Sequence, residues 1–256
     1  MSEPFNAEVL SPSSTARVDP PEERPGALRG GAVLTLHTRQ AQRLVKGRSH
    51  SAAKPAIIGL IGFANLARSV WHGARADDPF ADWWMLQVHE ALVQAEKALS
   101  QLALGMASCS SGMSALEVAP PSSVKPARVI LNFSNPYAFR AAHLIGVLDG
   151  LTCKVLSARH VGLLTRDDAG RLLQQAGREV RRALQSPVGY RFLGVTRRDV
   201  AQGTAKASQA REAMGELPDD VLTASRRAPH APAVAQSPHG SPLSDPARLS
   251  ALPSLG

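Results

Sequence analysis

The chain has 256 residues, and its 29 Lys and Arg outnumber its 21 Asp and Glu to give a net charge of +8. Its two cysteines, Cys109 and Cys153, stand far apart without a CxxC pair, which excludes a disulfide framework and a structural zinc site. The start has no basic segment followed by an apolar run, and the longest apolar stretch, near residues 56–64, is too short to cross a membrane. We therefore expect a cytoplasmic protein with no membrane contact.

The two ends of the chain differ in composition from the middle. Residues 1–25 and 227–256 are rich in Pro, Ser and Ala and have little hydrophobic periodicity. Such segments bury too little apolar surface to offset the entropy lost on ordering, so we expect disordered tails. Residues 26–226 are predicted to form a single helical core domain, mostly α, with two short β-strands.

The first predicted element is a short strand at residues 32–37, AVLTLH. Its side chains alternate between an apolar face and a face that carries Val33, Thr35 and His37. Thr38 is then a favoured N-cap residue for a helix that Gly47 ends.

That first helix has a cationic side. Arg39, Arg43 and Lys46 stand at i, i+4 and i+7, so they are predicted to form one stripe along the helix.

Two longer helices follow. Residues 56–74 are strongly apolar, and close approach of another element would explain why this segment contains Gly59 and Gly62. In DDPFADWW, residues 77–84, Asp78 is a favoured N-cap, a proline suits the first helical position and Asp82 lies in the first turn. We expect this second helix to span about 25 residues, judging by its apolar repeat.

The same acidic segment raises the question of a metal site. Asp78, Asp82 and His89 would share one face of the helix, but no further ligand stands at a matching spacing. Helix capping is therefore the interpretation we adopt, and neither a metal nor a cofactor is expected.

The second half repeats these signals. Residues 127–134 alternate as a second strand, and Asn135 followed by proline begins another apolar helix. Thr165 and Thr196 each precede an aspartate by three residues, the spacing of a capping box. The helix after Thr196 is predicted to continue to Met214, and one short turn is predicted at residue 218.

Charge is segregated along the chain. Residues 29–54 hold six Arg and Lys and no acid, and residues 159–211 hold eleven Arg and Lys against four acids. Between them, residues 77–117 hold six acids against Lys97 alone. Clustered cations bind polyanions by releasing condensed counterions, so the pattern favours a partner such as DNA.

Sequence motifs of catalysis are missing. The chain has no GxxxxGK[ST], no GxSxG and no GxGxxG after a strand, and HEALV lacks the second His of HExxH. We therefore predict that the protein is not an enzyme. The alternative, a nuclease that uses Asp77, Asp78 and Asp82, would require metal-dependent cleavage.

Eight segments together resemble a known family. They are LHTRQAQRLVKGR (36–48), DDPFADWW (77–84), NPYAF (135–139), SARHVGLL (157–164), GREVRRAL (177–184), YRFLGVTRRDV (190–200), TAKASQAREAMGELPDDVL (204–222) and RAPHAP (227–232). The chain resembles the integrating conjugative element proteins grouped with AcaB-like transcriptional regulators. Phe80, Ala138 and Phe139 depart mildly from the pattern, which has Tyr and Gly-Tyr there.

The resemblance implies a bacterial accessory protein of a mobile element that controls conjugative transfer genes, and it brings no catalytic residues. It also implies a homodimer that binds DNA through a ribbon-helix-helix element, in which strands from two chains enter the major groove. The alternative for the strand at 32–37 is pairing within the chain against 127–134.

The candidate DNA-binding residues are the polar and basic side chains of the first strand and helix and of the second basic segment: Thr35, His37, Arg39, Arg43, Lys46, Arg48, Arg178, Arg181, Arg182, Arg197 and Arg198. The competing hypothesis is a non-catalytic assembly or adaptor protein whose basic faces bind other element-encoded proteins.

Overall fold

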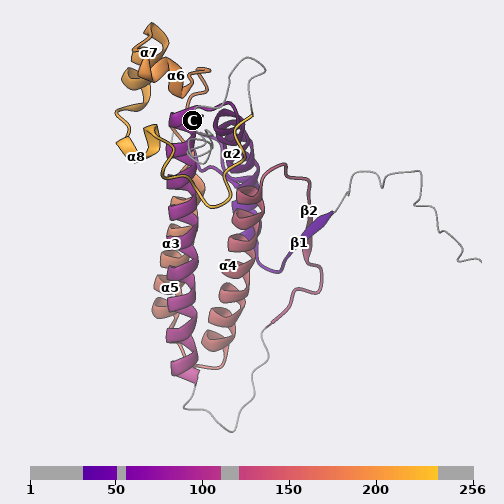
Figure 1. The fold of residues 1–256 in the computed structure, drawn as a ribbon. Helices are drawn as coiled ribbons and strands as arrows, with labels where there is room; N and C mark the ends of the chain where they lie inside the picture. Colours follow the sequence, from indigo (N-terminus) through magenta and orange to yellow (C-terminus); the bar gives the residue numbers. More distant parts are fainter. Residues whose placement is uncertain (1–30, 51–55, 111–120, 236–256) are drawn as a thin grey trace, which may run out of the picture. The chain divides into compact units, whose positions relative to one another are not determined.

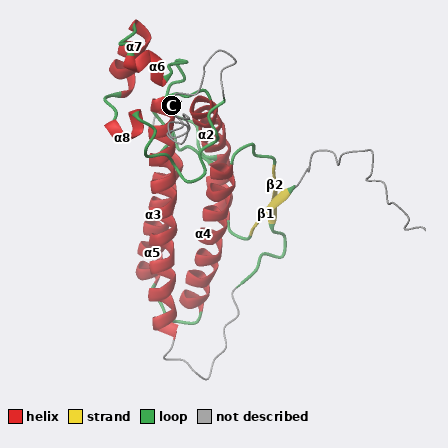
Figure 2. Ribbon diagram, in the orientation of Figure 1, coloured by secondary structure: helices red, strands yellow, loops and turns green. Residues whose placement is uncertain are grey.

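The computed structural model describes residues 31–50, 56–110 and 121–235, and those from Ala32 onward belong to one compact unit. In chain order the elements are β1 (Ala32–Leu36), α1 (Arg39–Lys46), α2 (Leu60–Arg75), α3 (Pro79–Ser110), β2 (Ala127–Leu131), α4 (Pro136–His160), α5 (Arg166–Gln185), α6 (Arg197–Ala201), α7 (Ala205–Met214) and α8 (Asp219–Leu222). Helices dominate the described residues, and their strands form one small sheet (Figure 2), which confirms the mostly α class. The predicted tail at 1–25, and residues 236–256 of the tail predicted at 227–256, lie outside the described residues.

The long helices form the core. α3 packs against α2, α4 and α5 (Figure 1). α4 also packs against α5, α1 and β1. Phe63, Phe80, Leu92, Tyr137 and Leu148 are among the largest fully buried side chains. Each such burial stabilises the fold by roughly 1.5–3 kcal/mol before entropy is counted. α4 is long and apolar enough to cross a membrane, but most of its apolar window is buried in this core, as in a soluble protein.

Capping side chains begin the helices where the sequence predicted. Thr38, Asn135, Thr165 and Thr196 each accept a hydrogen bond from the backbone N–H three residues later. At Thr196 the reciprocal bond is also present, because the Asp199 carboxylate accepts from the Thr196 N–H at 2.9 Å. These local bonds satisfy donors that every helix start leaves unpaired.

The start of α2 differs from its prediction. The helix begins at Leu60 rather than residue 56, because Ile57 pairs with Arg48 through two backbone hydrogen bonds of 2.8 Å. This bridge brings Gly47 and Gly59 together so closely that a Cβ on Gly59 would lie 2.3 Å from the Gly47 nitrogen. Close backbone approach is thus confirmed as the role of Gly59.

Other boundaries also shift. α3 continues to Ser110 and has 32 residues rather than about 25, and β2 ends at Leu131 rather than residue 134. The helix predicted from Thr196 to Met214 is divided into α6 and α7. Gly203 has a φ of +63° between them, a conformation that a continuous helix cannot contain.

The packed part of the chain extends past residue 226. Ala228 is buried, and Arg227 reaches the Asp82 carboxylate with two hydrogen bonds of 2.9 Å. The Ala235 N–H donates to the Arg75 carbonyl at 2.8 Å. Residues 227–235, which composition assigned to the tail, therefore lie against α2 and α3, because specific hydrogen bonds replace the missing hydrophobic periodicity.

Candidate nucleic-acid interface

The β1–α1 unit separates its apolar and cationic sides. Ala41, Leu44 and Val45 of α1 are buried, whereas Arg39, Arg43 and Lys46 are all exposed. In the described part of the chain, none of these three side chains has an acidic partner within ion-pair distance. The predicted cationic stripe is therefore present, and no acid among the described residues neutralises its charge.

Asp149 of α4 holds this unit in place. Its carboxylate, only 3% exposed, accepts hydrogen bonds from the His37 N–H at 2.7 Å, the Thr38 N–H at 2.8 Å and the Thr38 Oγ1 at 2.6 Å. A negative charge at this end also complements the dipole of α1. Sequence analysis missed Asp149, and the available signal was a lone carboxylate inside an apolar helix.

β1 pairs within the chain, so of the two alternatives the structure contains the intrachain one. β1 and β2 are antiparallel, and Val33 lies opposite Ile130 while Thr35 lies opposite Arg128. All four side chains are exposed on the outer face of this ribbon. Each chain therefore builds a two-stranded ribbon without a second copy.

The ribbon continues into a polar loop. His37 is exposed beyond β1, and its Nδ1 accepts from the Ser123 N–H at 3.1 Å. Arg128 was absent from the predicted set, because a single arginine in an alternating strand shows its partner only once the register is known. It adds a cation to the ribbon face beside Thr35.

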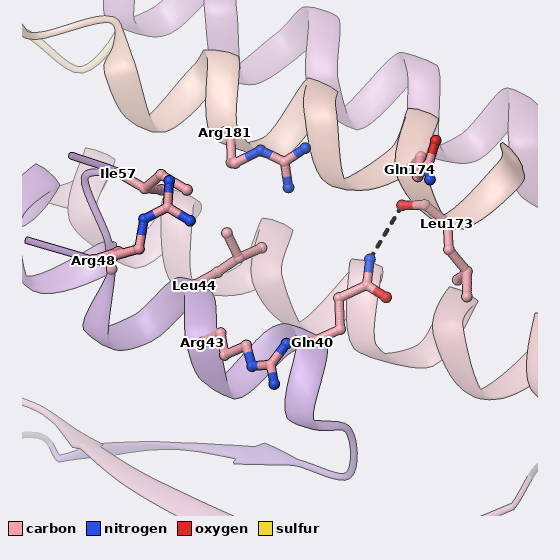
Figure 3. Close-up of a pocket in the computed structure, with 9 residues that line it drawn as sticks. Gln40, Arg43, Leu44, Arg48, Ile57, Leu173, Gln174 and Arg181 are labelled. Atoms are coloured by element: carbon pink, nitrogen blue, oxygen red, sulfur yellow. Dashed lines mark hydrogen bonds between the residues drawn. The ribbon is translucent and has the colours of Figure 1, made fainter. Parts of the chain in front are cut away.

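A cleft of about 730 Å³ lies between α1 and α5. Figure 3 shows the guanidinium groups of Arg43, Arg48 and Arg181 on different sides of Leu44. The Gln40 amide donates to the Leu173 carbonyl at 3.1 Å and so joins the two helices at one end of the cleft. Arg43, Arg48 and Arg181, predicted in separate segments, are thus brought together.

The other arginines of α5 lie in different surroundings. Arg178 is exposed, and Arg182 forms an ion pair of 2.8 Å with Glu179 on its own helix. Arg181, which is half-buried, faces the cleft. These three arginines of α5 therefore do not belong to one common surface.

Arg197 has an internal role. Its guanidinium bonds Asp77 at 2.6 Å and Asp82 at 2.5 Å, and it also donates to the carbonyls of Leu222 and Val221. Only 14% of its side chain is exposed, so we exclude it from the proposed interface. Its neighbour Arg198 is exposed but lies on α6, away from the β1–α1 unit in sequence.

The three aspartates of the acidic segment are all engaged. Asp78 caps α3 through the Phe80 N–H and accepts from the Tyr190 hydroxyl at 2.8 Å, and burial raises the pKa of Asp78. Asp82, fully buried, is paired with Arg197 and Arg227. Within the described residues no group of three metal-ligating side chains occurs.

Fold and surface together define a helical protein with an exposed cationic helix beside a two-stranded ribbon. The family model described as transcriptional regulator AcaB matches residues 24–235. The chain belongs to this family of transcriptional regulators.

Among solved structures, the crystal structure of selenomethionine-containing AcaB from uropathogenic E. coli is similar, with a TM-score of 0.54 and 18% identity over 76% of this chain and 95% of that chain. At this identity the likeness shows the fold alone. No curated protein matches the chain.

Proposed function

We propose that the protein regulates transcription by binding DNA through the surface formed by α1 and the outer face of the ribbon. We call this the α1–ribbon surface, and it consists of Val33, Thr35, His37, Arg39, Arg43, Lys46, Arg48, Arg128 and Ile130. The observation that carries the proposal is the stripe of Arg39, Arg43 and Lys46, exposed and without an acidic partner in the described part of the chain. Such cations release counterions from the DNA backbone and so supply affinity.

In this proposal, the ribbon is the element that recognises the DNA sequence. The major groove of B-DNA is about 12 Å wide and admits a two-stranded ribbon. Thr35 and Arg128 offer hydrogen-bonding groups to base edges, and Val33 and Ile130 offer methyl groups that fit beside thymine methyls. The stripe on α1 then contacts phosphates and fixes the register.

The proposal also covers which genes the protein controls and its oligomeric state. The resemblance set out above supports control of transfer genes on an integrating conjugative element, and a homodimer that would bind a twofold-symmetric site. Sedimentation of the chain alone and with DNA measures the assembly. A monomer under both conditions would contradict the homodimer.

The experiment compares two triple variants of equal charge. R39A/R43A/K46A removes the stripe, and R159A/R166A/R191A removes three exposed cations outside the α1–ribbon surface. Salt-titrated mobility shifts with the element's upstream regions measure affinity and salt slope. The stripe variant should lower the slope of log affinity against log salt by about 3, because each lost phosphate contact contributes about 0.9. The control variant should change it by less than about 1. Equal slopes for a folded stripe variant and wild type would refute the proposal.

The competing function is an adaptor that binds another element-encoded protein. The exposed apolar pair Val33 and Ile130, 47% and 72% exposed, favours it, since a protein partner would also cover this pair. Affinity capture after nuclease treatment separates the two functions. Recovery of one element-encoded protein that I130S abolishes, together with no retention of DNA, would favour the adaptor.

A further inference from the structure

The cleft between α1 and α5 has the chemistry of a site for a small phosphorylated ligand. Its rim carries Arg43, Arg48 and Arg181, and its wall includes the apolar side chains of Leu44, Ile57 and Leu173. No acidic side chain lines it in the described part of the chain. Guanidinium groups bind phosphate oxygens with two parallel hydrogen bonds, and apolar walls suit a flat organic body.

Within the part of the chain that the structure describes, two of these arginines have no ion-pair partner. Among the described residues, neither Arg43 nor Arg181 takes part in an ion pair, although α5 supplies Glu179 and Asp168 to Arg182 and Arg171. Arg181 is half-buried with its guanidinium against the helix at Gly177, where an added Cβ would lie 3.0 Å from its Nη1. A half-buried guanidinium without an anion is a ready partner for a ligand's phosphate.

The cleft is built from fixed elements. The Arg48–Ile57 bridge and the close contact of Gly47 with Gly59 hold its wall on the side of α2, and the Gln40–Leu173 hydrogen bond holds α1 to α5. Its volume of about 730 Å³ falls in the range of pockets that enclose small organic ligands. A duplex groove needs a protruding element, which this concave site does not provide.

We propose that this cleft binds a small phosphorylated organic molecule of the nucleotide class. The phosphate contacts Arg181, and the organic body of the ligand lies against Leu44 and Leu173 and reaches Arg43. Arg43 belongs to both this cleft and the α1–ribbon surface, so the ligand and DNA compete for one side chain. This competition rests on the proposed function, whereas ligand binding itself does not.

Calorimetric titration of the full chain tests ligand binding without DNA. The probes are the four ribonucleoside monophosphates, with adenosine and inorganic phosphate as partial ligands. We expect saturable binding of at least one nucleotide with one site per chain, and weaker binding of both partial ligands. R181A should weaken nucleotide binding about tenfold, because a hydrogen bond to a charged group is lost. R181K, which keeps the charge but not the paired donors, should also weaken it.

R178A is the matched control. Arg178 is exposed on the same helix, one turn away, and does not line the cleft, so R178A should leave nucleotide affinity within about twofold.

Saturating nucleotide should then lower the DNA affinity of wild type. Absence of binding for all four nucleotides, or equal losses in R181A and R178A, overturns the site. If R181A instead weakens DNA binding while no nucleotide binds, the cleft holds a backbone phosphate and the proposal is wrong.

Discussion

Replacement of Asp149 tests whether one buried carboxylate holds the cationic helix in position. Its three hydrogen bonds, of 2.6 to 2.8 Å, join α4 to the junction of β1 and α1. Each hydrogen bond to a charged group contributes about 1.5–3 kcal/mol, but losing the carboxylate also removes the cost of burying its charge. We therefore expect D149A to lower the free energy of unfolding by about 3 kcal/mol, less than the sum of the three bonds. For a domain of this size that corresponds to a Tm lower by roughly 6–12 °C.

Urea unfolding followed by circular dichroism measures the effect. D149N keeps one acceptor oxygen and should lose about half as much as D149A, and E212Q, an exposed change on α7, should lose less than about 0.5 kcal/mol. D149A should also weaken DNA binding, because the stripe on α1 loses its fixed position. Equal stability of D149A and E212Q would refute the role assigned to Asp149.

Two further predictions concern the acidic side chains. D82N should lower the free energy of unfolding by about 3–5 kcal/mol, because Arg197 and Arg227 lose the buried carboxylate they share. Proteolysis after residue 226 should become faster as well. Unchanged digestion would contradict the role of Asp82 in holding Arg227. Asp199 has a lowered pKa, mainly because it accepts from the Thr196 backbone N–H, so its stabilisation is present above its ordinary pKa and is lost as the pH falls from about 4. The Tm of D199N should therefore fall less than that of wild type between pH 7 and pH 3, and parallel curves would contradict this.

Features set by neighbours in sequence were predicted well. The caps at Thr38, Asn135, Thr165 and Thr196 depend on a side chain and a backbone N–H three residues apart, so sequence alone shows both partners. The stripe on α1 follows from helical spacing, and the structure shows that all three of its side chains are exposed.

Features set by distant neighbours were not predictable in the same way. Asp149 meets Thr38 across 111 residues, and Arg227 meets Asp82 across 145. Arg197 was predicted to bind DNA because it stands beside Arg198 in a basic segment of the sequence. In the structure, however, its carboxylate partners come from α3 and from the turn before α3. A charge pattern counts cations but cannot tell which of them a distant acid neutralises.

The distribution of carboxylates explains why a surplus of cations remains on α1. Asp77 and Asp82 neutralise Arg197 and Arg227 inside the fold, whereas Asp149 is satisfied by two backbone N–H groups and one hydroxyl. The carboxylate that positions α1 thus forms no ion pair with the stripe. It lies at the helix start, near Arg39, whereas eight residues at 1.5 Å each place Lys46 at the far end of α1 about 12 Å away, beyond the screening length of about 8 Å at physiological salt. Asp149 can therefore hold α1 in place without cancelling the charge of the stripe, because its carboxylate bonds backbone N–H groups rather than the arginine and lysine side chains.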